Sequence, residues 1–348
     1  MLLLLCTIGL NFYLYSIVPK GFCPVQDTGR LSGIIQADQS ISSEAMQQKL
    51  ADFVDTLRRD PEIETVIGFT GGQRGMNSGI MFATLKPLGE RKLTVNQLME
   101  RLRDKLENEP GARLILQPPQ DLRIGARGSS ALFEYALQAD NLPELRTWIP
   151  RIVKALSQRP ELVDVNTNQQ DKGRQIALQV DRDLAARLGV SQALINATLG
   201  NAFGQRQVSV IYNPLNQYRV IMEVAPDYSQ SQEALKHIYV SVPSGGQVPL
   251  SAFSSYGVTN TPLSVNHQSQ FPAGTLSFNL KPGISLSTAT RVIAETMNDL
   301  GVPATIHGSF QGTARAFKES LSNQPWLILA AIVAIYIVLG VLYESYVH

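Results

Sequence analysis

Two uninterrupted apolar runs lie at the two ends of the chain. Leu2 to Val18 carries no charged residue, and as a helix its roughly 17 residues would span about 25 Å, close to the thickness of a bilayer core. Trp326 to Tyr343 is a second uncharged run of similar length, and Pro325 suits the first turn of a helix. The pattern predicts a transmembrane helix at each end, over residues 1–19 and 325–344, with everything between them on one side of a membrane.

Between these runs, short segments of alternating apolar residues are separated by longer segments with a helical period. LSGIIQA and IETVIGFTG are typical of strands, and SSEAMQQKLADFVDTLRRD between them is typical of a helix capped by Ser42 or Ser43. GIMFATLKP, a helix near Val95 to Asn108, and ARLILQP repeat this order. Two such units make one split β-α-β sandwich, which we place at residues 25–122.

The same order of elements recurs further along the chain. LFEYALQAD, a helix within Leu142 to Gln158, and LVDVNTN form a third unit, while TLSFNLKPG, SLSTATRVIAETMNDL and PATIHG form a fourth. A second sandwich is therefore predicted at residues 131–172 and 272–312, interrupted by an inserted subdomain over residues 173–271. The predicted fold class is α+β, with two ferredoxin-like (split β-α-β) sandwiches, an insertion, and one transmembrane helix at each end.

A glycine-rich loop joins two strands of the first sandwich. Ile67 and Phe69 before it, and Phe82 after it, alternate onto one face of the predicted sheet. The loop residues that permit rearrangement or offer polar contacts are Gly71, Gly72, Arg74, Gly75 and Asn77. The pattern favours a mobile lip on an apolar cleft, with a long surface connection as the simple alternative. A phosphate-binding loop is not favoured, because no Gly-Lys-Ser/Thr follows.

The strands of the first sandwich are apolar at both alternating positions, as in Ile34/Ile35 and Met81/Phe82. Helices cover one face of such a sheet, so we expect something apolar to cover the other. The second sandwich, another subunit or a ligand could each cover this second face.

Composition and motifs argue against an enzyme. The net charge of +1 gives no field that would attract nucleic acid, and the four histidines are far apart, so neither a nucleic-acid partner nor a metal site is expected. No G-x-S-x-G motif is present, and Asp181 and Asp183 are better explained as helix-capping residues than as acid/base groups. We therefore expect no catalytic residues and no cofactor.

A signal peptide does not explain the first apolar run, because no basic residue precedes it and no Ala-x-Ala site follows.

Several strings resemble one family of membrane proteins. VPKGFCPVQDTG follows the first apolar run, NSGIMFATLKP follows the glycine loop, VDRDLAARLGVS and VPLSAFSS lie in the insertion, and LYESY ends the second run. In this order they resemble the second half of a resistance-nodulation-division (RND) drug-efflux permease, over essentially the whole chain. NAFGQRQVSVIYNPLNQYRV and QPPQDLRIG are most similar to the Mdt-type subgroup, in which two different permease subunits assemble. The chain would then be a piece of a longer membrane protein.

This resemblance implies a homo- or heterotrimeric antiporter in the inner membrane of a Gram-negative bacterium, with this piece in the periplasm. The sandwiches would be porter domains that cycle between access, binding and extrusion shapes, driven by protons that cross elsewhere in the protein. The insertion would be a docking subdomain. The implied partners are other permease subunits, a periplasmic membrane-fusion adaptor, an outer-membrane channel, and hydrophobic substrates such as amphiphilic drugs or bile-salt-like compounds.

The resemblance also implies roles for residues by their position. Residues 71–77 correspond to a switch loop between two substrate pockets. The corresponding pocket walls are Ile67, Phe69 and Phe82 in a deep pocket and Leu114, Leu116, Asn166 and Asn168 in a nearer access cleft. The loop is shorter than in the best-known drug pumps and lacks phenylalanine. Because an aromatic contact is worth about 0.5 to 1.5 kcal/mol beyond burial, we expect a narrower or more amphiphilic substrate range.

Two other interpretations stay open from the sequence. A two-span receptor with an extracytoplasmic ligand-sensing domain needs only a folded loop between two membrane helices. A structural adaptor of an envelope complex would need no ligand at all.

Overall fold

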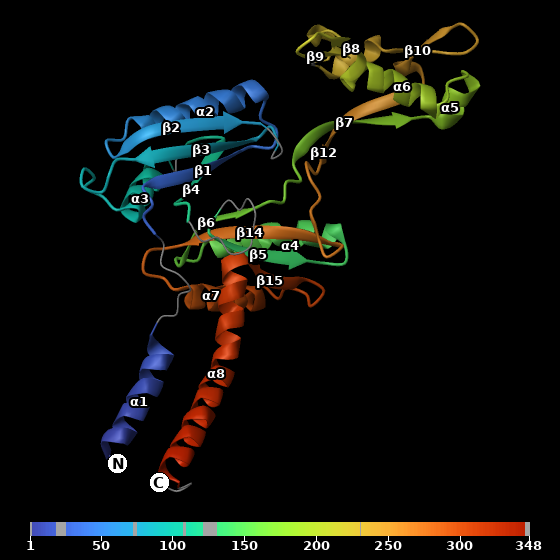
Figure 1. Ribbon diagram of the computed structural model, residues 1–348. Helices are drawn as coiled ribbons and strands as arrows, with labels where there is room; N and C mark the ends of the chain where they lie inside the picture. Colours follow the sequence, from blue (N-terminus) through green and yellow to red (C-terminus); the bar gives the residue numbers. More distant parts are fainter. Residues whose placement is uncertain are drawn as a thin grey trace. The chain divides into compact units, whose positions relative to one another are not determined.

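The computed structural model describes residues 2–18, 26–71, 75–106, 109–120, 131–229 and 231–344 (Figure 1). It separates into two compact units. The large unit comprises Met1–Gly173 and Pro262–His348, and the insertion unit comprises Arg174–Thr261. The chain is a mixed α and β protein, in agreement with the predicted class.

The first sandwich of the large unit is a four-stranded antiparallel sheet with two helices. Its strands follow the order β2-β3-β1-β4. Its elements are β1 (Arg30–Ala37), α2 (Ser43–Arg58), β2 (Ile63–Thr70), β3 (Ser78–Leu85), α3 (Val95–Leu106) and β4 (Ala112–Gln117). Leu57 of α2 and Leu102 of α3 share one buried cluster with Ile35 of β1, so both helices cover the same face of the sheet.

Local sequence explains where these helices form. The Ser42 hydroxyl accepts a hydrogen bond from the backbone N–H of Ala45, which caps the start of α2 as predicted. The buried residues Met46, Phe53 and Leu57 recur on one side of α2. The helix therefore presents an apolar stripe to the sheet and a polar side to water.

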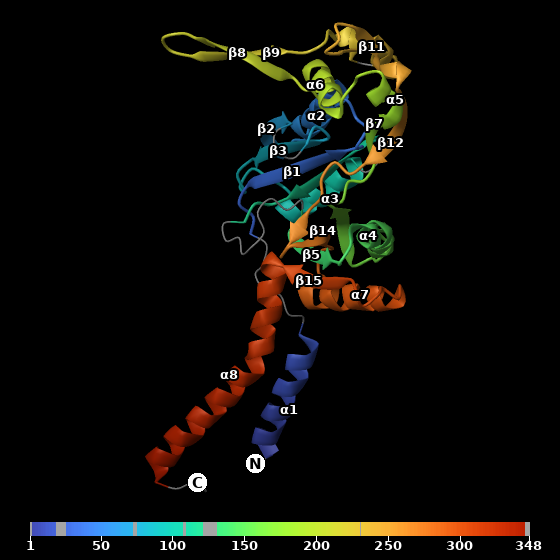
Figure 2. The ribbon, with the colours of Figure 1, turned by 90° about the vertical axis from the view of Figure 1, so that its right-hand side faces the viewer.

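The second sandwich repeats this arrangement with strands from both sides of the insertion. Its elements are β5 (Phe133–Gln138), α4 (Leu142–Ser157), β6 (Leu162–Thr167), β14 (Phe271–Leu280), α7 (Leu286–Asp299) and β15 (His307–Gln311), with the short β13 (His267–Gln268) added beside β14. β14 pairs with β5 and β6, and β15 pairs with β5, all antiparallel. The resulting order β6-β14-β5-β15 matches that of the first sheet, and Figure 2 shows α4 and α7 beside it.

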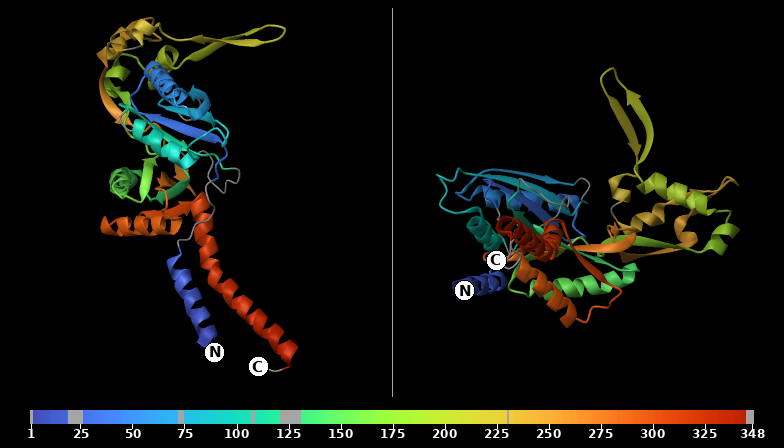
Figure 3. Two further views of the ribbon diagram at one scale, coloured as in Figure 1. Left: turned by 90° about the vertical axis from the view of Figure 1, so that its left-hand side faces the viewer. Right: turned by 60° about the horizontal axis from the view of Figure 1, so that its bottom comes forward.

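The insertion unit has a hydrophobic core of its own, which includes Ile195, Val240 and Phe253. Its elements are β7 (Gly173–Val180), α5 (Arg182–Arg187), α6 (Gln192–Phe203), β8 (Arg206–Tyr212), β9 (Gln217–Met222), β10 (Tyr239–Ser241), β11 (Gln247–Pro249) and β12 (Ser254–Thr261), with 3-10 turns η1 (Pro226–Tyr228), η2 (Gln232–His237) and η3 (Leu250–Ala252). Asp181 caps α5 as predicted, since its carboxylate accepts from the backbone N–H groups of Asp183 and Leu184. The β8–β9 hairpin extends away from the rest of this unit (Figure 3).

The terminal helices differ from the prediction in one respect. α8 (Gly312–Tyr343) begins directly after β15 and not at Pro325, which lies inside it. The earlier start has a physical reason, because Ala314 and Phe317 are buried in a small apolar cluster with Leu286. Pro325 costs the helix one hydrogen bond but does not end it.

Length and apolarity single out one of these helices. Among the residues that the structure describes, α8 is the one helix long and apolar enough to cross a membrane. α1 (Leu2–Ile17) is also apolar, but with 16 residues it is shorter than the 18 residues taken here as the minimum for a membrane span. The hydroxyl of Tyr15 in α1 lies 3.1 Å from the side-chain oxygen of Gln324 in α8. Two membrane spans stay a prediction.

Candidate functional site

The face of the first sheet that points away from α2 and α3 is covered at one end. Ile34 of β1 pairs with Ile115 of β4 on this face, and both side chains are buried. Gln36 lies on the same face of β1, and its side-chain oxygen accepts a hydrogen bond from Asn166 of β6. The second sandwich therefore lies against the β1–β4 end of the first sheet.

The other end of the same face is open. Ile67 of β2 pairs with Phe82 of β3, and Phe69 pairs with Ile80. Ile67 is 53% exposed, Phe69 59% and Phe82 51%. The predicted pocket-wall residues on β2 and β3 thus form one exposed apolar patch, which we call the open face. It is a surface of this chain and not an enclosed pocket.

Leu114 and Leu116 do not belong to this face. Both are buried in the cluster beneath α2 and α3, and their assignment to a cleft wall stays a prediction. The side chains of β4 alternate, and it is Ile115 that lies on the outer side. Because the segment Leu114–Leu116 is apolar at every position, its sequence did not show which residues face the helices.

Asn166 and Asn168 lie close together, but their side chains have different hydrogen-bond partners. Asn166 donates to Gln36 and so bridges the two sandwiches. Asn168 bonds to Thr275 instead: its side-chain oxygen accepts from the Thr275 N–H at 2.8 Å, and its own N–H donates to the Thr275 carbonyl at 3.1 Å. Asn168 therefore prolongs the pairing of β6 with β14, while Asn166 alone lies at the boundary.

The glycine loop is anchored at its end by Asn77. Gly71 and Gly75 have φ values of +83° and +97°, a backbone conformation that favours glycine. Gly72 and Arg74 lie outside the described residues. Asn77 is buried, and its amide donates to the carbonyl of Ala37 at 3.3 Å and to the side-chain oxygen of Gln170 at 3.0 Å. Asn77 therefore fastens the end of the loop to the second sandwich.

Sequence reasoning missed the residues that complete the boundary between the sandwiches. Arg103 of α3 forms an ion pair with Asp164 of β6, with a distance of 2.7 Å between Nη2 and Oδ2. The backbone N–H of Lys172 donates to the side chain of Gln39. One signal was available for Asp164, because Leu162 and Val165 are both apolar but three residues apart, a spacing that breaks strand alternation.

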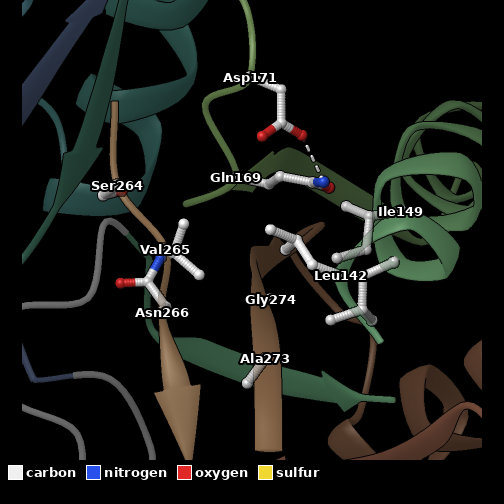
Figure 4. Close-up of a pocket in the computed structure, with 10 residues that line it drawn as sticks. Leu142, Ile149, Gln169, Asp171, Ser264, Val265, Asn266, Ala273 and Gly274 are labelled. Carbon is white, nitrogen blue, oxygen red and sulfur yellow. Dashed lines mark hydrogen bonds between the residues drawn. The ribbon is translucent and has the colours of Figure 1, made fainter. Parts of the chain in front are cut away.

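A shallow depression lies between α4 and the strands of the second sandwich (Figure 4). Leu142 and Ile149 line its apolar side. On its polar side, Asp171 accepts a hydrogen bond from Gln169 at 2.5 Å and pairs with Arg146 at 3.3 Å. None of the predicted substrate residues lines this depression. Within the described part of the chain, no group of His, Cys, Asp and Glu residues could hold a metal ion.

Comparison with known proteins places this geometry in a family. The model of the AcrB/AcrD/AcrF family matches residues 1–348. The chain belongs to this family. The resemblance to RND multidrug efflux permeases is thereby confirmed.

Two proteins similar to this chain carry the name multidrug resistance protein MdtC. The protein from Yersinia enterocolitica is 55% identical over 348 residues, and the one from Yersinia pseudotuberculosis is 54% identical. These matches cover 100% of this chain and 34% of each relative, so the chain spans about a third of their length.

Solved structures show the same fold. One crystal form of a heavy metal efflux pump superposes with a TM-score of 0.87 at 19% identity, over 98% of this chain and 37% of that one. A second crystal form gives a TM-score of 0.85 over 96% of this chain. At this identity the likeness shows the fold of the RND family alone.

Proposed function

We propose that this chain is the substrate-path and docking part of a proton-driven inner-membrane efflux permease. It exports amphiphilic drugs or bile-salt-like compounds by alternating access within a trimer. The observation that carries the proposal is the open face, where Ile67, Phe69 and Phe82 lie together and exposed beside the glycine loop. Contiguous exposed apolar side chains of this kind mark a site for a partner or a ligand.

The chemistry of the open face fits amphiphilic compounds. Two aromatic rings and a β-branched side chain offer apolar area, while Thr65 and Thr84, which pair across the same two strands, add hydroxyl groups beside it. Removal of apolar area from water is favourable by about 25 cal/mol per Å². Arg30 of β1 is exposed and pairs with Thr84 at the edge of these residues, so a substrate there would meet apolar area, hydroxyl groups and one positive charge.

The remaining parts fit the same function. The two sandwiches serve as ferredoxin-like porter domains, and the insertion unit as the docking subdomain. It contacts other permease subunits, a membrane-fusion adaptor or an outer-membrane channel. α1 and α8 hold these parts on the periplasmic side of the inner membrane. The run Trp326 to Tyr343 contains no ionisable carboxylate or lysine, so proton transfer belongs to helices outside this chain.

The test replaces Phe82 in the full-length subunit and compares it with a matched residue. Phe82→Ala removes an aromatic ring from the open face. Phe271→Ala removes an equally exposed ring, 50% against 51%, from β14 of the second sandwich. Resistance of cells to a panel of amphiphilic compounds is measured for both. We expect Phe82→Ala to lower resistance to part of the panel and Phe271→Ala to leave it unchanged. Equal resistance for both variants across the panel would count against the open face as the substrate surface.

A further inference from the structure

Arg103 and Asp164 form the one ion pair among the described residues that joins the two sandwiches. Arg103 Nε lies 3.0 Å from Asp164 Oδ1, and Arg103 Nη2 lies 2.7 Å from Oδ2. Both oxygens of the carboxylate are therefore engaged by one guanidinium. Such bidentate contacts are among the strongest hydrogen bonds in proteins and fix direction as well as distance.

A β-bulge sets the direction of the Asp164 side chain. Asn166 pairs with Ser277 and Val163 pairs with Asn279, so two residues of β6, Asp164 and Val165, face a single residue of β14. The extra residue lets Leu162 and Val165 both face the core. It also places Asp164 on the outer side, with a left-handed φ of +55° that few residues other than glycine adopt.

Asn279 holds the carboxylate in this position. Its amide nitrogen donates to Asp164 Oδ2 at 2.9 Å, and its side-chain oxygen accepts from the backbone N–H of Leu132 at 2.9 Å. Asn279 is itself buried. Asp164 is thus fixed by its own sandwich, with its oxygens presented to Arg103 of the other.

The other contacts across this boundary are weaker in kind. Three of them, Asn166 with Gln36, Asn77 with Gln170, and the Lys172 N–H with Gln39, are hydrogen bonds between groups without charge, and the attraction between the Asp38 and Lys172 side chains acts without an ion pair at contact distance. The amides of these residues exchange protein partners for water at little net cost. The ion pair is different, because the Asp164 side chain is 9% exposed and loses its counter-charge if the sandwiches move apart.

We propose that the Arg103–Asp164 pair is a latch that holds the two sandwiches together. The latch breaks each time the sandwiches separate to admit a substrate between them, and this second step rests on the proposed transport function. Breaking it is reversible, because Arg103 is 29% exposed and can turn to water, while Asp164 keeps the hydrogen bond from Asn279.

The test measures the separation of the sandwiches directly in the full-length subunit. Cys6 and Cys23 are replaced by serine together with any cysteine elsewhere in the subunit. Spin labels are then attached at Ala51 of α2 and Ala294 of α7, which are both exposed. Double electron–electron resonance (DEER) spectroscopy then gives the distribution of distances between the two spin labels. The variants are Arg103→Gln and Asp164→Asn, which remove one charge each and keep the side-chain shape close to the original.

Arg101→Gln is the matched control. Arg101 lies on the same helix and pairs with Asp60 at 2.6 Å, but both residues belong to the first sandwich. Arg103→Lys, which keeps the charge but cannot form two parallel hydrogen bonds, is expected to lie between the original protein and Arg103→Gln.

We expect Arg103→Gln and Asp164→Asn to raise the population of the longer distance by about tenfold, and Arg101→Gln to leave it unchanged. Label distances that stay the same in both latch variants would overturn the proposal, as would an equal change in Arg101→Gln. Export of a fluorescent amphiphile is measured in parallel. Changed distances in a subunit that exports nothing would refute the transport function and leave the latch standing.

Discussion

The side-chain amide of Asn77 lies 3.0 Å from the side-chain oxygen of Gln170. Asn77 ends the glycine loop, and Gln170 precedes the insertion by a few residues. The carbonyl of Gln170 also accepts a hydrogen bond from the backbone N–H of Leu263, in the segment that follows β12, at 2.8 Å. The loop of one sandwich is therefore fastened to the base of the segment that interrupts the other.

Asn77→Ala should loosen the glycine loop. The substitution removes the hydrogen bonds to Ala37 and Gln170, and a hydrogen bond of this kind contributes about 1 kcal/mol. Amide hydrogen exchange in the full-length subunit should become faster over the loop and over the adjoining end of β3. Asn168→Ala, which removes a hydrogen bond to Thr275 within the second sandwich, is the control. Unchanged exchange in Asn77→Ala would show that Asn77 does not anchor the loop.

Gly75→Ala should strain the same loop from within. Gly75 has φ of +97°, and a Cβ atom there would lie 3.2 Å from Asn77 Oδ1. We expect the variant to lose about 1 to 3 kcal/mol of stability or to shift the loop, since non-glycine residues in such conformations carry strain of this size. Gly89→Ala is the control, because Gly89 has no positive φ and no atom within 4 Å of its Cβ position. Equal thermal unfolding of the two variants would contradict the prediction.

Local patterns predicted the elements well but did not reveal the contacts between them. The caps at Ser42 and Asp181 follow from the preference of short polar side chains for helix starts, and the open face follows from alternation along β2 and β3. The sequence did not show that Leu114 and Leu116 face the helices, because a fully apolar strand has no polar side to orient it. The Arg103–Asp164 pair joins residues 61 positions apart, and the local sequence around each residue does not indicate which residue it contacts.

The ion pair of Asp27 with Arg91 should make stability depend on pH. Burial alone would raise the pKa of Asp27, but the Arg91 side chain at 2.9 Å and the backbone N–H groups of Gly29 and Val95 favour the carboxylate and lower its pKa below 3.8. A lowered pKa means stabilisation that is complete above the unfolded value and lost as pH falls through the folded one. The original protein should therefore lose stability below about pH 4.

Asp27→Asn tests this dependence. Near pH 7 the variant leaves Arg91, whose side chain is 1% exposed, without a counter-charge, so we expect a loss of about 3 kcal/mol. The difference from the original protein should shrink as pH falls from about 4 through the lowered folded pKa of Asp27, because residue 27 is neutral in both proteins below that pKa. Thermal unfolding of the subunit at several pH values measures it. A difference that stays constant from pH 7 down to the acid limit would contradict the assigned role of Asp27.

Phe317 connects the first turns of α8 to the second sandwich. It is 4% exposed and lies in a cluster with Ala314 and Leu286, while β15 runs into α8 with no loop between them. Phe317→Ala should lower stability by about 3 to 5 kcal/mol, the usual cost of removing a buried phenylalanine. It should also loosen the packing of the helix on the sheet, because Ala314 is then the one α8 side chain left in this cluster.

Lys318→Ala is the control for this change, since Lys318 is the next residue of α8 and is exposed. Both variants are compared in membranes for unfolding temperature and for export of a fluorescent amphiphile, with equal amounts of inserted subunit. We expect Phe317→Ala to lower both and Lys318→Ala to lower neither. If Phe317→Ala lowers the unfolding temperature but exports at the original rate, the packing of α8 on the sandwich stabilises the subunit without transmitting movement to it.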